Sequence, residues 1–138
     1  MDSSSTRLDT VKWWRGRQEL DARKAHSDAQ AEEQQARARE QQLREALAKE
    51  TRAQGNSALW ELSDLSRAAE EKKLKAAAEV TAKAAKRTGE KHALHVVAHQ
   101  KLKAVEKVVE SLIEEARQES ARKEMRDLDE LAVLRFAR

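Results

Sequence analysis

The sequence predicts an all-α protein, a long antiparallel two-helix coiled-coil hairpin with a short helical tip segment. Ala, Glu, Lys, Arg, Gln and Leu dominate the composition, and these residues are strong helix formers. Proline is absent and glycine occurs only three times, so residues that break helices are nearly missing. Apolar residues recur at spacings of three and four, which is typical of helices that pair along a seam.

The composition narrows the class of protein. A chain of 138 residues with 38% charged and 3% aromatic residues has little material for a thick globular core, so we expect one hairpin over residues 1–138. Cysteine is absent, which excludes disulfides and fits the reducing cytoplasm. No apolar stretch approaches the roughly 20 residues that span a bilayer, and the polar start "MDSSSTRLD" lacks a signal-peptide core. We therefore expect neither membrane insertion nor export by that route.

The first helix is expected over about residues 6–53. "SSST" at residues 3–6 offers N-caps, and Asp9 suits the positive end of the helix dipole. Apolar or small residues then mark a seam that alanine and polar residues dilute. The apolar and small seam positions are Leu8, Val11, Ala22, Ala25, Ala29, Ala36, Leu43, Ala46 and Ala53.

A turn is expected at 54–57, followed by the tip segment at 58–89. Gly55 and Asn56 suit a helix C-cap, and Ser57 can begin a new helix. Gly89 allows a kink, a cap or a helix-internal glycine, and we favour a continuous helix there.

The return helix is expected over about residues 90–137 and carries the strongest apolar seam. If it pairs antiparallel with the first helix, Leu8 lies near Leu131 and residues 54–89 form the far tip. The chain ends would then meet. The seam positions are Ala98, Leu102, Val105, Val109, Leu112 and Ala116, then after a phase shift Ala121, Met125, Leu128 and Ala132.

Two apolar segments are expected to contact partners. At the joined ends, adjacent helical residues point about 100° apart, so Trp13 and Trp14 cannot both enter a narrow seam. Phe136 lies too near the chain end for full coverage, and Arg15, Arg17 and Arg135 surround this surface with charge. At the tip, a cluster either caps the hairpin or contacts another protein. That cluster consists of Leu59, Trp60, Leu62 and Leu65.

Other signals in the sequence are less specific. His92, His95 and His99 lie roughly along one helical face, but the absence of Cys and of a following Glu favours a structural role over metal binding. The Lys-rich stretch at 72–107 permits nucleic-acid binding, although it lacks interleaved aromatic residues. Nothing suggests a catalytic pocket, so we expect a protein that is not an enzyme and needs no cofactor.

The two chain ends together resemble the FliJ/YscO family of type III export proteins. The C-terminal "LDELAVLRFAR" is similar to the pattern that closes the second long helix of that family, and Leu8, Val11, Arg15, Glu19 and Ala22 are similar to its opening helix. Chain length and polar composition are also similar. The predicted break and short helix before the return helix are also similar to that family.

The resemblance implies a non-enzymatic, monomeric, cytoplasmic stalk, peripherally associated with a membrane-bound export apparatus. Its joined termini would enter the hexameric export ATPase, its tip would contact the cytoplasmic ring of the export gate, and it would escort export chaperones. A basic nucleic-acid-binding protein and a generic coiled-coil scaffold are the alternatives. From the resemblance, the ATPase contacts are Leu8, Val11, Arg15, Leu128, Ala132, Arg135 and Phe136. From side-chain chemistry and position we add Trp13, Trp14, Arg17 and Leu131, and assign Leu59, Trp60, Leu62 and Leu65 to the gate.

Overall fold

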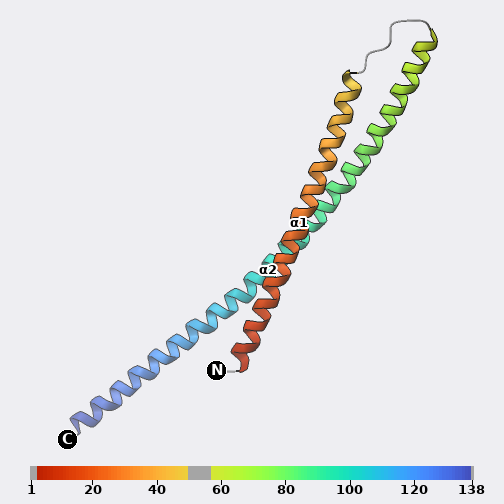
Figure 1. The fold of residues 1–138 in the computed structure, drawn as a ribbon. Helices are drawn as coiled ribbons and strands as arrows, with labels where there is room; N and C mark the ends of the chain where they lie inside the picture. Colours follow the sequence, from red (N-terminus) through yellow and green to blue (C-terminus); the bar gives the residue numbers. More distant parts are fainter. Residues whose placement is uncertain (1–2, 50–56, 138) are drawn as a thin grey trace. The chain divides into compact units, whose positions relative to one another are not determined.

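The computed structural model describes residues 3–49 and 57–137, and all of these except Ala137 are helical. Helix α1 runs over Ser3–Lys49 and helix α2 over Ser57–Phe136 (Figure 1). The two helices pack against each other, so the prediction of an all-α helical hairpin is confirmed. The predicted turn at 54–57 lies outside the described residues, apart from Ser57.

Helix α2 continues without a break through Gly89. A Cβ added at Gly89 would meet nothing within 4 Å, so close packing does not require glycine there. Ion pairs one turn apart support both helices, as between Glu33 and Arg37 at 2.8 Å in α1 and between Arg67 and Glu71 at 3.3 Å in α2. Without proline, nothing in the sequence interrupts the backbone hydrogen bonds of α2.

The chain divides into two compact units. One unit contains Leu20–Val97, and the other contains Met1–Glu19 together with Ala98–Arg138. Each unit takes a part of α1 and a part of α2, and each is described by itself below.

In the Leu20–Val97 unit the helices approach most closely around Ala29 and Ala84, which are 5% and 9% exposed. The Thr88 hydroxyl lies 3.1 Å from the Ala29 carbonyl oxygen on α1 and 3.0 Å from the Ala84 carbonyl oxygen on its own helix. One turn along α1, Arg87 Nη1 donates to Glu32 Oε2 at 2.9 Å. These contacts fix an antiparallel register in which Ala29 faces Thr88.

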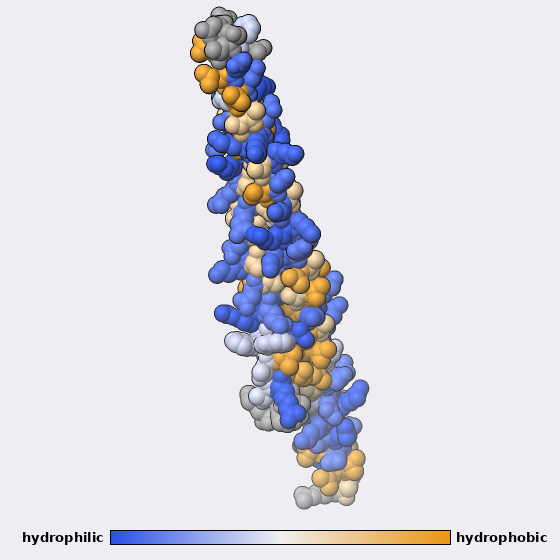
Figure 2. Space-filling view, turned by 90° about the vertical axis from the view of Figure 1, so that its right-hand side faces the viewer, coloured by the Kyte–Doolittle hydropathy of each residue, from blue (hydrophilic) through white to orange (hydrophobic). Residues whose placement is uncertain are grey.

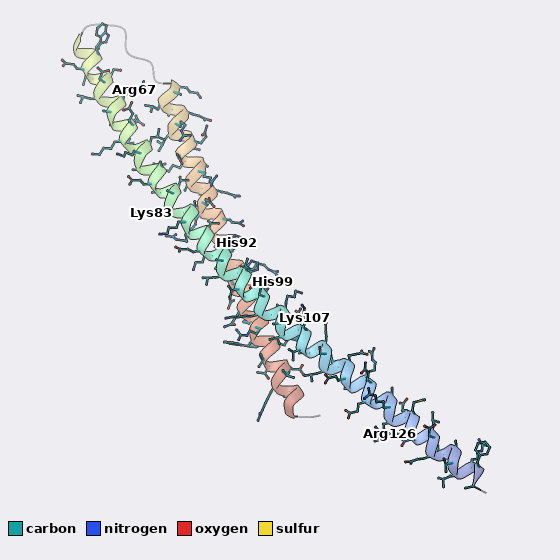
Figure 3. All side chains as sticks on the ribbon, turned by 180° about the vertical axis from the view of Figure 1, so that it is seen from behind. Arg67, Lys83, His92, His99, Lys107 and Arg126 are labelled. Atoms are coloured by element: carbon teal, nitrogen blue, oxygen red, sulfur yellow. The ribbon has the colours of Figure 1, made fainter. Side chains whose placement is uncertain are left out.

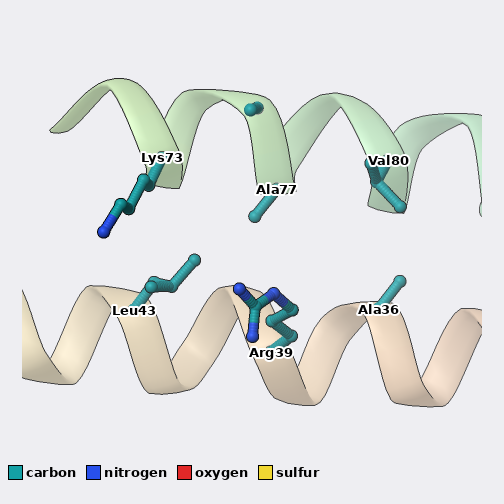
Figure 4. Close-up of a pocket in the computed structure, with 7 residues that line it drawn as sticks. Ala36, Arg39, Leu43, Lys73, Ala77 and Val80 are labelled. Atoms are coloured by element: carbon teal, nitrogen blue, oxygen red, sulfur yellow. The ribbon is translucent and has the colours of Figure 1, made fainter. Parts of the chain in front are cut away.

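Small residues line most of this seam, which therefore buries little apolar area per residue. Towards the end of α1, a groove between the helices is lined by side chains from both (Figure 4). In that view Leu43 and Arg39 of α1 face Lys73 and Ala77 of α2. The part of residues 58–89 that begins near Leu74 thus lies along α1 instead of forming the tip that the sequence analysis expected. The half-buried α2 positions here are Glu70, Leu74, Ala77, Ala78, Thr81, Ala85, Thr88, Lys91 and His95.

In the other unit, the first turns of α1 pack beside the middle of α2. Glu19 is 2% exposed, and its Oε1 lies 3.8 Å from Nδ1 of His99. Along α2 the predicted seam positions Ala98, Leu102, Val105 and Val109 are half-buried, whereas every residue from Glu110 to Ala137 is exposed.

The predicted register, with Leu8 beside Leu131, is therefore wrong. Since Glu19 faces His99, Leu8 faces a position close to Glu110, and Leu131 lies about 30 Å further along α2. The reason is the continuity of α2. The prediction required residues 54–89 to fold apart from α1, but an unbroken α2 places residues 74–97 against it. Helix α1 has 47 residues and α2 has 80, so α1 covers only part of its partner.

Within the described residues, neither helix contains a stretch that is both long enough and apolar enough to cross a membrane.

Candidate interaction surfaces

Most of the large exposed apolar side chains in the Met1–Glu19 and Ala98–Arg138 unit lie at the end of α2, residues 110–136, which we call the C-terminal arm. α1 covers none of it, and Phe136 is 91% exposed. Five of the predicted ATPase contacts fall within its last three turns, so the structure brings them together: Leu128, Leu131, Ala132, Arg135 and Phe136. The large exposed apolar side chains of the arm are Leu112, Ile113, Met125, Leu128, Leu131, Val133, Leu134 and Phe136.

A second surface lies on α1 in the same unit. Trp13 and Trp14 are 69% and 50% exposed, so neither indole enters the seam, in agreement with the 100° spacing. The guanidinium carbon of Arg15 lies 5.0 Å from the Trp14 ring centroid, a cation–π distance. Arg15 Nη1 also donates to Gln18 Oε1 at 3.1 Å, so the arginine is held across the indole face. Val11 and Arg17 are exposed nearby, and Leu8 is half-buried.

The structure does not join these two surfaces, although the sequence analysis expected one joined end. With Glu19 facing His99, Trp14 lies level with a position near residue 104 of α2. Leu128 is about 24 residues further along, or roughly 36 Å at 1.5 Å per residue. The predicted ATPase contacts thus form two separate groups.

The predicted gate contacts lie in the first turns of α2, in the Leu20–Val97 unit. Leu59, Trp60, Leu62 and Leu65 are all exposed. Leu62 and Leu65 expose more than half of their surface, which leaves apolar area for a partner. The view in Figure 2 shows apolar side chains gathered in separate patches between hydrophilic ones.

Most lysines of the Lys-rich stretch are exposed, and Lys91 is half-buried. Some of its cations are paired: Lys73 lies 3.6 Å from Glu70, and Lys103 lies 3.1 Å from Glu106. Others have no ion pair among the described residues, namely Lys72, Lys75, Lys83 and Lys86. Figure 3 shows Lys83 and Lys107 among the many charged side chains along α2.

The helix seam brings His26 of α1 beside His92 and His95 of α2, which the sequence analysis had grouped with His99. The ring centroid of His26 lies 5.0 Å from that of His92 and 6.1 Å from that of His95. Sequence spacing could group only histidines of α2, because His26 joins them through the register between the helices. Among the described residues, no group of three potential ligands is arranged to hold a metal ion.

Comparison of the chain with family models, with curated proteins and with solved structures finds no match.

Proposed function

We propose that this protein is a non-enzymatic stalk of a type III protein export apparatus, flagellar or injectisome, which binds the hexameric export ATPase through its C-terminal arm. The observation that carries the proposal is the uncovered end of α2. Its last three turns expose Leu128, Leu131 and Phe136. The same turns carry the letters "LDELAVLRFAR" that resemble the FliJ/YscO family.

The physical character of the arm supports contact with a protein ring. Apolar side chains are interspersed with charges, as where Asp129 and Glu130 lie between Leu128 and Leu131. One helix inside a sixfold ring cannot match all subunits at once, so mixed polar and apolar contacts of modest strength suit it better than a single deep interface. Arg135 adds a cation able to meet carboxylates of the ring.

The remaining exposed apolar side chains provide the other contacts of the proposal. The cluster from Leu59 to Leu65 begins the same helix whose last turns bind the ATPase, and it would contact the cytoplasmic ring of the export gate. Trp13 and Trp14 on α1 add a further surface, which could serve the ATPase or an export chaperone. Both indoles combine a large apolar area with a polar N–H group, which suits reversible contacts.

The test is the rate of ATP hydrolysis by the cognate export ATPase with increasing amounts of this protein. A variant with Leu128, Leu131 and Phe136 replaced by alanine should lose the stimulation that the wild type gives. The matched control replaces Leu94 and Val97, which are exposed on α2 outside the arm, and should stimulate normally. Equal stimulation by the arm variant, with helicity unchanged in circular dichroism, would contradict the proposal.

Nucleic-acid binding is the second candidate, because Lys72, Lys75, Lys83 and Lys86 are exposed without an ion pair among the described residues. Binding through such lysines would weaken steeply with salt and would not depend on base sequence. Titration of duplex DNA and RNA at two salt concentrations decides between the candidates. Salt-sensitive binding that is lost when these lysines become glutamine favours the second, and the absence of binding favours the stalk.

A further inference from the structure

The C-terminal arm carries an apolar stripe that is separate from the seam between α1 and α2. The first set of predicted seam positions on α2 ends at Ala116, and the next apolar position follows five residues later, at Ala121. At about 100° per residue, this step turns the apolar side of the helix by about 140°. The stripe therefore does not continue the seam, and all of its residues are exposed. We define the arm stripe as Ala121, Met125, Leu128 and Ala132.

Two opposite charges flank the arm stripe. Arg122 follows Ala121 and Asp129 follows Leu128. The two charged residues are seven positions apart, close to two helical turns, so they lie on the same edge of the stripe. Both are exposed, and neither has an ion pair among the described residues. Both charges can therefore meet a partner.

We propose that a second copy of this chain binds the arm stripe, with the two arms antiparallel. In this arrangement Met125 of each chain packs on Leu128 of the other. Arg122 of each chain then meets Asp129 of the other. One two-fold axis generates both ion pairs, because the stripe is complementary to itself. The family resemblance implies a monomer, whereas the charges of the arm favour a weak dimer.

The charges of the arm also decide between the two possible orientations of the second copy. In parallel pairing, the residue just before a stripe position faces the residue five positions later on the other helix. That pairing would bring Glu124 beside Asp129, two carboxylates. It would also bring Arg117 beside Arg122, two guanidinium groups. Because antiparallel pairing joins opposite charges instead, it is the orientation that the electrostatics favour.

The uncovered part of α2 is long enough for this partner. When Met125 lies opposite Leu128, Phe136 at the end of one arm lies opposite Arg117 of the other. Residues 110–136 are all exposed, so the overlap stays within the part of α2 that α1 does not cover. The first helix of neither chain obstructs the pairing.

The interface is small, so we expect weak association. Its centre consists of the two contacts between Met125 and Leu128, flanked by two between Ala121 and Ala132. Interfaces of this size lie at the weak end of protein–protein contacts, and we expect a dissociation constant on the order of 100 µM. At the low micromolar concentrations of unfolding measurements the chain is then almost entirely monomeric.

Self-association goes beyond the proposed function and does not depend on it. One consequence does rest on the proposed function: a second copy and the export ATPase would compete for the same exposed arm.

The test is sedimentation equilibrium of the full chain, without any other protein, at concentrations from about 5 to about 500 µM. The apparent mass of the wild type should rise from that of the 15.7 kDa monomer towards twice this value. Arg122→Asp and Asp129→Arg each place like charges at both contacts, so each should raise the dissociation constant at least about tenfold. The double variant restores opposite charges and should associate like the wild type, as should a mixture of the two single variants.

The matched control is Lys123→Asp, which reverses a charge on the opposite side of the arm and should leave association unchanged. Circular dichroism checks that each variant keeps its helicity. The proposal is overturned if the wild type stays monomeric at the highest concentration. It is also overturned if the double variant does not regain association, or if the single variants associate as tightly as the wild type. Tighter association of the single variants would indicate parallel pairing and would equally overturn it. Since the assay contains no ATPase, its outcome leaves the proposed function to its own test.

Discussion

Two parts of α2 show how burial is decided in this protein. In the Leu20–Val97 unit, small residues such as Ala84 are buried against α1, whereas in the C-terminal arm a residue as large as Phe136 is 91% exposed. The arm carries several large apolar side chains, yet every one of its residues is exposed. Burial here follows the register of two helices of unequal length, not the hydrophobicity of each segment. An exposed apolar helix face is therefore left for contacts beyond the hairpin.

The difference in burial between the two parts can be tested by making the same substitution in each. Ala84→Leu inserts a large side chain where the helices approach most closely, so it should lower the free energy of unfolding by about 2–3 kcal/mol. Ala121→Leu in the arm meets only solvent and should change it by less than about 0.5 kcal/mol. Urea unfolding of both variants measures the difference. Equal effects would mean that the close approach at Ala84 does not hold the hairpin together.

A smaller effect is expected from the hydroxyl group that links the two helices. Thr88→Val keeps the shape of the side chain but removes the hydrogen bond across the seam, which should cost about 1 kcal/mol. Thr81→Val is the matched control, since the Thr81 hydroxyl bonds only the Ala77 carbonyl oxygen of its own helix among the described residues. The same unfolding assay should show little change for Thr81→Val. A loss as large as that of Thr88→Val would assign the effect to helix propensity instead.

The helical hairpin was predictable from the sequence because both helices carry a three-four spacing and almost no helix-breaking residue. Individual seam positions were predictable as well, as at Ala29, Leu102 and Val109. The register was not, because an alanine seam offers nearly equal pairings over many shifts along the helix. The contacts that select one pairing, such as Thr88 with Ala29, involve polar groups that a hydrophobic pattern does not weigh.

The helix register also limited how much of the candidate surfaces could be predicted from the sequence. Exposure of Trp13, Trp14 and Phe136 followed from local helical geometry and the closeness of the chain end, neither of which depends on register. The register did decide two other features. These are the separation of the two chain ends and the contact of His26 with His92 and His95. Each required knowing which residue of α1 faces which residue of α2.

The smallest effect on stability is expected in the arm itself. Replacing Leu128, Leu131 and Phe136 together by alanine should leave the free energy of unfolding within about 0.5 kcal/mol of the wild type, because these side chains are exposed. By contrast, the half-buried Leu102→Ala should cost at least about 1 kcal/mol. Thermal and urea unfolding of both variants provide the comparison. Marked destabilisation by the arm variant would show that its apolar side chains pack within the protein.

Pulsed electron paramagnetic resonance can test directly whether α1 leaves the C-terminal arm uncovered. The chain has no cysteine, so spin labels can be placed at exposed positions in two pairs, Asp9 with Glu110 and Asp9 with Glu130. We expect a separation typical of neighbouring helices for the first pair. For the second pair we expect about 30 Å or more, from about 20 further residues at 1.5 Å each. A second separation shorter than the first would place the arm beside α1 and show that α1 covers it.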